Sequence, residues 1–115
     1  MINFDSFLQY LQYEKRGSAL TVSAYRLDLQ QFFTFVEETQ DIDDLEKVTA
    51  DIIRAWTLTL LEDNGFSARS VNRKISSLKA FFKYEAQQQH ITHNPTLALQ
   101  APKFKGKLPE SVEQG

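Results

Sequence analysis

The chain has 115 residues, the length of one domain, and its 42% hydrophobic and 12% aromatic residues are typical of a folded protein. It contains no cysteine, which excludes disulfides, thiolate nucleophiles and cysteine-based zinc sites. No apolar run approaches the roughly 18 residues of a membrane span, and the N-terminus does not resemble a signal peptide. These observations favour a cytoplasmic protein without membrane contact.

The formal net charge of −2 alone argues against a nucleic-acid-binding protein, but the charges are unevenly distributed. Residues 67–84 contain arginines and lysines and no acid, and further lysines occur in residues 103–107. Acidic residues are concentrated in residues 41–46. The average charge therefore conceals one basic and one acidic segment.

Apolar residues at helical spacing predict two helices in the first 40 residues. The first covers about residues 4–15 and ends before Gly17. The second covers about residues 19–39, with Ser18 as its N-cap. Its apolar stripe consists of Tyr25, Leu29, Phe32 and Val36. The polar, acidic stretch 41–47 is predicted to be a loop.

Two further helices are predicted in the second half of the chain. One begins after the cap residue Thr49 and ends at Asn64-Gly65, since both residues tolerate the left-handed conformation. Trp56 is in register with its apolar face, so it is predicted to lie in the core. The other helix covers residues 67–89, with Ser67 as its cap. Its apolar stripe consists of Val71, Ile75, Leu78 and Phe82.

Asn94-Pro95 interrupts any helix, because the residue before proline avoids the α conformation. A short helical turn at residues 96–99 and an extended basic linker at residues 102–115 are expected beyond it. No run of residues is typical of a strand. The sequence therefore predicts an all-α fold, a compact four-helix bundle over residues 1–101 with a C-terminal extended linker.

The polar side of the fourth predicted helix is the clearest functional indication from periodicity. Guanidinium and ammonium groups suit phosphates and guanine edges, and small side chains allow close approach to DNA. A solvated helix face usually mixes both signs of charge, but basic runs are common, so both interpretations stay open here. The residues opposite or beside the apolar stripe include no acid and are Arg69, Asn72, Arg73, Ser76, Ser77, Lys79, Ala80 and Lys83.

The second predicted helix also carries polar residues on its non-apolar side. Thr21, Ser23, Arg26 and Gln30 would contact phosphates or bases if this side faces DNA. Asp28 is expected on the same surface, where its charge would weaken such contacts. An ordinary polar outer face explains these residues equally well.

Other chemistry has less support in the sequence. His90 and His93 have a spacing that suits metal ligation, but no third or fourth ligand is evident, so loop or helix-end histidines are favoured. No phosphate-binding glycine loop and no arrangement of nucleophile, base and oxyanion donor is recognisable. We therefore predict no catalytic residue, cofactor, metal or small-molecule ligand.

Four segments, in order, resemble the N-terminal domain of Xer-like tyrosine recombinases, the phage integrase family. Residues 21–29 are similar to the family pattern T-x-x-x-Y-x-x-D-L. Residues 67–84 are similar to S-x-x-S-x-x-R-x-(I/L)-S-x-L-(K/R)-x-F-F-x-(Y/W). Asn94-Pro95 and the segment 102–109 follow as they do in the family. The resemblance covers nearly the whole chain.

The resemblance implies a SAM-like, core-binding domain that forms half of a C-shaped clamp around a DNA half-site. Its second and fourth helices would approach the major groove of double-stranded DNA. For the full protein it implies a tetramer on DNA during integration or recombination. Together with the polar face described above, it predicts the DNA-binding residues Thr21, Tyr25, Arg26, Arg69, Ser70, Asn72, Arg73, Lys74, Ser76, Ser77, Lys79, Lys83 and Lys103.

The family's catalytic domain normally follows the Leu-Pro linker and carries two arginines, a lysine, histidines and the tyrosine nucleophile. That pattern is not recognisable in these 115 residues. The resemblance thus implies that this part of the protein is not itself an enzyme. A helical protein–protein interaction module without DNA binding is the alternative, and an exposed apolar patch would favour it.

Overall fold

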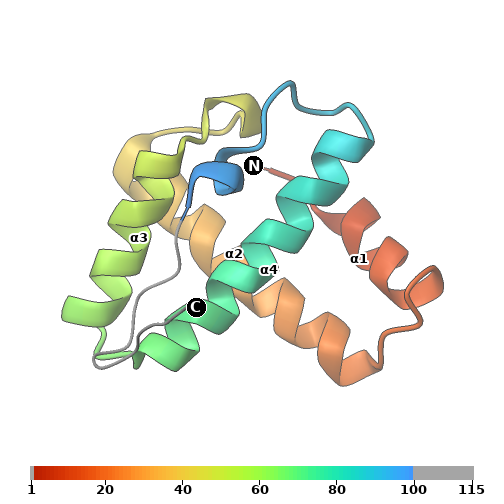
Figure 1. Cartoon of the computed structure of the whole chain (residues 1–115), viewed down its shortest axis with the longest axis horizontal. Helices are drawn as coiled ribbons and strands as arrows, with labels where there is room; N and C mark the ends of the chain where they lie inside the picture. Colours follow the sequence, from red (N-terminus) through yellow and green to blue (C-terminus); the bar gives the residue numbers. More distant parts are fainter. Residues whose placement is uncertain (1, 100–115) are drawn as a thin grey trace, which may run out of the picture.

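The computed structural model describes residues 2–99, which form an all-α fold without strands, as predicted (Figure 1). The four helices are α1 (Asp5–Tyr13), α2 (Ala19–Gln40), α3 (Ala50–Glu62) and α4 (Ala68–Gln87). Two short 3₁₀ helices are η1 (Leu45–Lys47) and η2 (Pro95–Ala98). The predicted linker, residues 102–115, lies outside the described residues.

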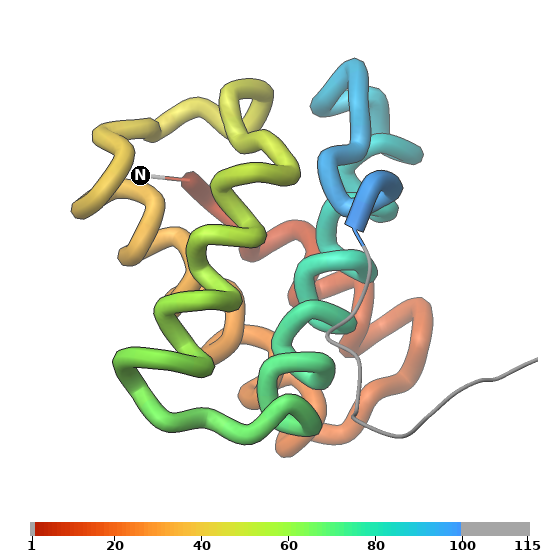
Figure 2. The backbone as a smooth tube through the Cα atoms, turned by 60° about the vertical axis from the view of Figure 1, so that its left-hand side comes forward, coloured from red at the N-terminus to blue at the C-terminus, as the bar shows by residue number. Residues whose placement is uncertain are grey.

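Helix α4 occupies the centre of the bundle. It crosses α2, while α1 and α3 lie on opposite sides of this crossing (Figure 1). After α4 the chain turns back, and η2 packs against both α3 and α4 (Figure 2). Because α4 contacts α1, α2, α3 and η2, a large part of its circumference is buried. Between residues 2 and 99, no helix is both long and apolar enough to cross a membrane.

The helix boundaries follow from local capping. The side chains of Ser18, Thr49 and Ser67 accept the backbone N–H three residues further on, at 3.1, 3.3 and 3.2 Å. Each therefore satisfies one N–H that has no partner within its helix, and all three predicted N-caps are confirmed. After α3, Gly65 has a φ of +73°, a conformation that glycine adopts without strain.

One segment contains more structure than expected. The acidic stretch 41–47 was predicted as a loop, but it includes η1. The side chain of Asp44 caps this turn by accepting the backbone N–H of Glu46 at 3.0 Å. A single turn of this kind has no apolar periodicity, so hydrophobic spacing could not indicate it.

The core is built largely from aromatic rings. The predicted core residues are all buried and are Leu29, Phe32, Trp56, Ile75, Leu78 and Phe82. Trp56 is 3% exposed, and its ring lies edge-on to that of Phe32 with 5.1 Å between centroids. Phe81 of α4 packs against Phe7 of α1 and Phe33 of α2 in the same way. The interpretation of Trp56 as a core residue is confirmed.

Glu46 joins the α2–α3 connection to the segment between α4 and η2. Its carboxylate accepts hydrogen bonds from the backbone N–H and the hydroxyl of Thr92, both at 2.9 Å. These bonds, helped by His93 with Nδ1 at 3.4 Å, lower the pKa of Glu46 below its ordinary value. His90 instead contacts Glu85, so the two histidines bind different acids.

This contact predicts a pH dependence of stability. A carboxyl whose pKa is lowered by folding stabilises the protein above its ordinary pKa, about 4.3, and this contribution disappears as pH falls through the lowered value. Glu46→Gln should therefore reduce the loss of unfolding free energy between pH 7 and pH 3, measured by urea denaturation. Glu62→Gln, at an exposed position at the end of α3, should retain the full loss. Equal losses in Glu46→Gln and the unaltered protein would contradict this.

Candidate functional site

One exposed side of α4 carries only basic and small polar residues. Spacings of three and four residues place them along one side of the helix, since α-helices have 3.6 residues per turn. The only acid in α4, Glu85, is buried. Ser70 and Asn72 are half-buried at the margin of this surface. We define the α4 basic face as the exposed residues Arg69, Arg73, Ser76, Lys79 and Lys83.

The beginning of α2 carries the other predicted site residues. Thr21 and Arg26 are exposed, and the hydroxyl of Thr21 accepts a hydrogen bond from Ser18 at 3.0 Å. Tyr25 is half-buried, with its ring edge-on to Phe7 at 5.8 Å. Tyr25 therefore contributes to packing as well as to the surface.

Two predicted site residues lie in the interior. Ser77 was expected on the exposed side of the fourth helix, and this is wrong, because it is only 5% exposed. Lys74, another predicted site residue, is 2% exposed. The predicted apolar stripe of this helix was too narrow, since α1, α2, α3 and η2 all pack against α4. Lys103 lies outside the described residues.

Both buried residues contact Asp28 of α2, whose side chain is completely buried. The expectation that Asp28 lies on the surface is therefore wrong. One carboxylate oxygen accepts from Arg73 at 2.9 Å and from the Ser77 hydroxyl at 2.7 Å. The other accepts from Arg73 at 3.3 Å and from the Lys74 ammonium at 3.1 Å. Lys74 also donates to Gln31 at 2.6 Å.

This network connects the interior to the α4 basic face. Burying a carboxylate or an ammonium group is costly unless each is paired and hydrogen-bonded, and here both conditions are met. Two bases against one acid leave one formal positive charge in the cluster. Arg73 carries this charge to the surface, because its side chain is 55% exposed.

A groove of about 510 Å³ lies where α1, α2 and α4 meet. The predicted site residues Thr21, Tyr25 and Lys83 line it. Lys15, which the sequence did not single out, lines it too, with its ammonium 5.9 Å from the ring centroid of Tyr10. Lys15 lies two residues after the end of α1, and only tertiary packing brings it to the same groove as Lys83. It extends the basic surface beyond α4.

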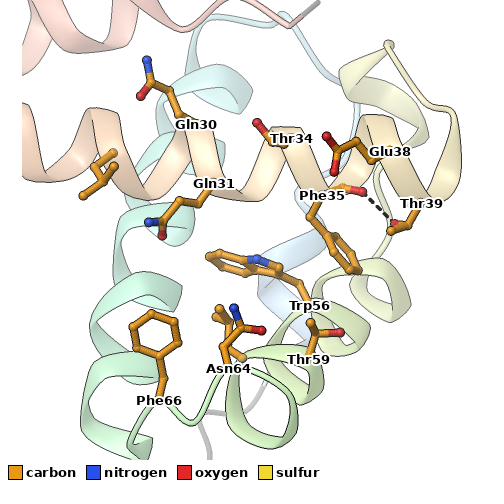
Figure 3. Close-up of a pocket in the computed structure, with 12 residues that line it drawn as sticks. Gln30, Gln31, Thr34, Phe35, Glu38, Thr39, Trp56, Thr59, Asn64 and Phe66 are labelled. Carbon is orange, nitrogen blue, oxygen red and sulfur yellow. Dashed lines mark hydrogen bonds between the residues drawn. The ribbon is translucent and has the colours of Figure 1, made fainter.

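A second hollow, between α2 and α3, has a different character. It measures about 460 Å³, and Trp56 lies at its floor between Phe35 and Phe66 (Figure 3). Its lining is otherwise mostly amides, hydroxyls and apolar groups, with Glu38 as its single charged residue. Without a basic residue, this hollow is poorly suited to phosphate.

The family model for the phage integrase N-terminal SAM-like domain matches residues 4–89 of this chain. The chain therefore belongs to this family. The solved structure of the integrase from mycobacterium phage Brujita has the same fold, with a TM-score of 0.72 and 22% sequence identity. That match covers 92% of this chain and 34% of the phage chain.

Two curated relatives are tyrosine recombinases. Tyrosine recombinase XerC of Anoxybacillus flavithermus is 36% identical over 110 residues, which are 94% of this chain and 36% of the relative. Tyrosine recombinase XerD of Staphylococcus saprophyticus is 34% identical over 109 residues, with 95% and 36% covered. The chain thus spans about a third of the length of these relatives. The family resemblance inferred from the sequence patterns is confirmed.

Proposed function

We propose that this chain is the DNA-binding N-terminal domain of a site-specific tyrosine recombinase. In this proposal the α4 basic face and the exposed residues Thr21 and Arg26 of α2 contact double-stranded DNA. The observation that carries the proposal is the absence of any exposed acid on α4 beside four exposed cations. The family membership and the recombinase relatives support it.

For the whole protein, we propose a catalytic domain beyond the linker that completes a clamp around one DNA half-site. Four such protomers would assemble on two duplexes in the cytoplasm to exchange strands. The domain described here would hold the DNA and fix the position of the protein along it. Contacts from cations and from the protein backbone position a protein on DNA without cleaving it. Lys103 would add a phosphate contact from the linker.

Salt dependence tests this proposal first. If the four exposed cations of the α4 basic face neutralise about four phosphates, the logarithm of affinity should fall with that of salt concentration at a slope near −3.6. Between 50 and 200 mM salt, duplex binding should weaken roughly a hundredfold. Fluorescence anisotropy with a labelled mixed-sequence duplex measures both quantities.

A charge reversal then locates the surface. Lys83→Glu should weaken binding on the order of tenfold and make the salt slope shallower by about 0.9, because one phosphate contact is lost. Lys47→Glu makes the same change at an exposed position of η1 and should leave the slope unchanged. Arg73→Glu is unsuitable, because it would place a second carboxylate beside buried Asp28. Equal binding by the Lys83 and Lys47 variants would favour the protein-interaction alternative.

A further inference from the structure

Arg73 is the only cation of the α4 basic face that bonds to a fully buried acid within the described residues. We propose that Asp28 is a positioning residue for DNA binding. Its buried carboxylate holds the Arg73 guanidinium in one orientation at the surface and so strengthens binding, although Asp28 is itself negatively charged. This inference rests on the proposed function and assigns a role to a buried acid beneath the DNA-contacting surface.

The geometry of Arg73 supports this role. Two different nitrogens of its guanidinium donate to the two carboxylate oxygens, at 2.9 and 3.3 Å. Such a two-point contact fixes both the position and the plane of the group. A guanidinium has five N–H donors, so donors remain for a phosphate or a base edge. The 55% exposure of the side chain leaves room for such a partner.

Asp28 is itself held firmly. Both of its oxygens have two donors each, and the additional donors come from Lys74 and Ser77. These two residues lie one and four positions after Arg73, so a single stretch of α4 surrounds the carboxylate. Because four donors surround the carboxylate and it is buried, it has no alternative orientation in solvent. The guanidinium is thereby ordered before DNA arrives, which lowers the entropic cost of binding.

For Asp28→Asn, the proposal predicts a change in DNA affinity opposite in direction to the change expected from charge alone. Asp28→Asn removes one negative charge, and charge alone would then strengthen binding to a polyanion. Positioning predicts weaker binding, because the amide nitrogen of asparagine cannot accept a hydrogen bond, so Arg73 loses at least one of its two bonds to this side chain. The sign of the change therefore separates the two accounts.

A matched pair of arginine substitutions provides the second test. Arg73→Lys keeps the charge but loses the two-point contact, and should weaken binding about threefold to tenfold. Arg69→Lys is the same change one turn earlier, at a side chain without a hydrogen bond between residues 2 and 99. Because Arg69 also belongs to the α4 basic face, this variant should lose some affinity too. Its loss should be clearly smaller than that of Arg73→Lys, since the charge is kept and no two-point contact is broken.

The experiment measures duplex affinity by fluorescence anisotropy for the unaltered chain, Asp28→Asn, Arg73→Lys, Arg69→Lys and the double variant Asp28→Asn/Arg73→Lys. Circular dichroism and urea unfolding establish that each variant is folded. If Asp28 acts through Arg73, adding Asp28→Asn to Arg73→Lys should cause little further loss. A merely structural role would give the same additional loss in both backgrounds.

The inference is overturned if folded Asp28→Asn binds as tightly as the unaltered chain or more tightly. It is also overturned if Arg73→Lys and Arg69→Lys bind equally, a comparison that decides the matter even where Asp28→Asn does not fold. In either case Lys83→Glu still weakens binding, so the proposed function survives. Failure of the proposed function is distinct, because the unaltered chain would then show neither salt-dependent binding nor sensitivity to Lys83→Glu.

Discussion

Asp28→Ala should lower the free energy of unfolding by about 3–5 kcal/mol, because it leaves the ammonium of Lys74 buried without its counter-ion. The Lys74 side chain is 3% exposed and its remaining polar partner is Gln31. Urea denaturation followed by circular dichroism measures the loss. Asp51→Ala is the matched control, since Asp51 forms a 2.7 Å ion pair with Arg54 but its side chain is 91% exposed. An exposed pair should contribute about 1 kcal/mol or less.

Replacing the acid and the buried base together should have a much smaller effect. In Asp28→Leu/Lys74→Met no buried charge remains unpaired, and such replacements are often neutral or stabilising. A double variant as unstable as Asp28→Ala would show that the cost comes from lost packing at the α2–α4 crossing. Equal losses in Asp28→Ala and Asp51→Ala would show instead that the network contributes no more than a surface pair.

The helices and the core could be predicted because their causes are local. Ser18, Thr49 and Ser67 cap helices through hydrogen bonds to residues three positions away. Apolar spacing likewise places Trp56 and Leu78 inward without knowledge of the rest of the fold. Among the helices of residues 2–99, only η1 was not predicted, because one turn of 3₁₀ helix has too few residues to show a period.

The site was harder to predict, because the burial of a polar residue depends on distant partners. Lys74 and Ser77 are buried only because Asp28, more than 40 residues away in the sequence, meets them in the core. The sequence contained one indication that Asp28 is buried. Asp28 lies three residues after Tyr25 and four before Phe32, within the apolar side of α2. An acid at such a position needs basic partners in the interior.

The largest single loss of packing should follow from Trp56→Ala. Its indole is 3% exposed and lies between α2 and α3, with the Phe32 ring at 5.1 Å and Phe35 and Phe66 nearby (Figure 3). Removing a buried tryptophan costs the transfer free energy of the ring and leaves a cavity. We expect the free energy of unfolding to fall by about 3–5 kcal/mol, measured by urea denaturation.

Leu58→Ala is the control for this substitution. Leu58 lies on the same helix but is 54% exposed, so its truncation should change the free energy of unfolding by about 0.5 kcal/mol or less. A hollow of about 460 Å³ lies beside Trp56, so neighbouring side chains have room to relax. We therefore expect the loss to fall toward the lower end of this range. A loss below about 1 kcal/mol for Trp56→Ala would mean that the ring contributes little to the core, and that α2 and α3 are held together by the surrounding aliphatic contacts instead.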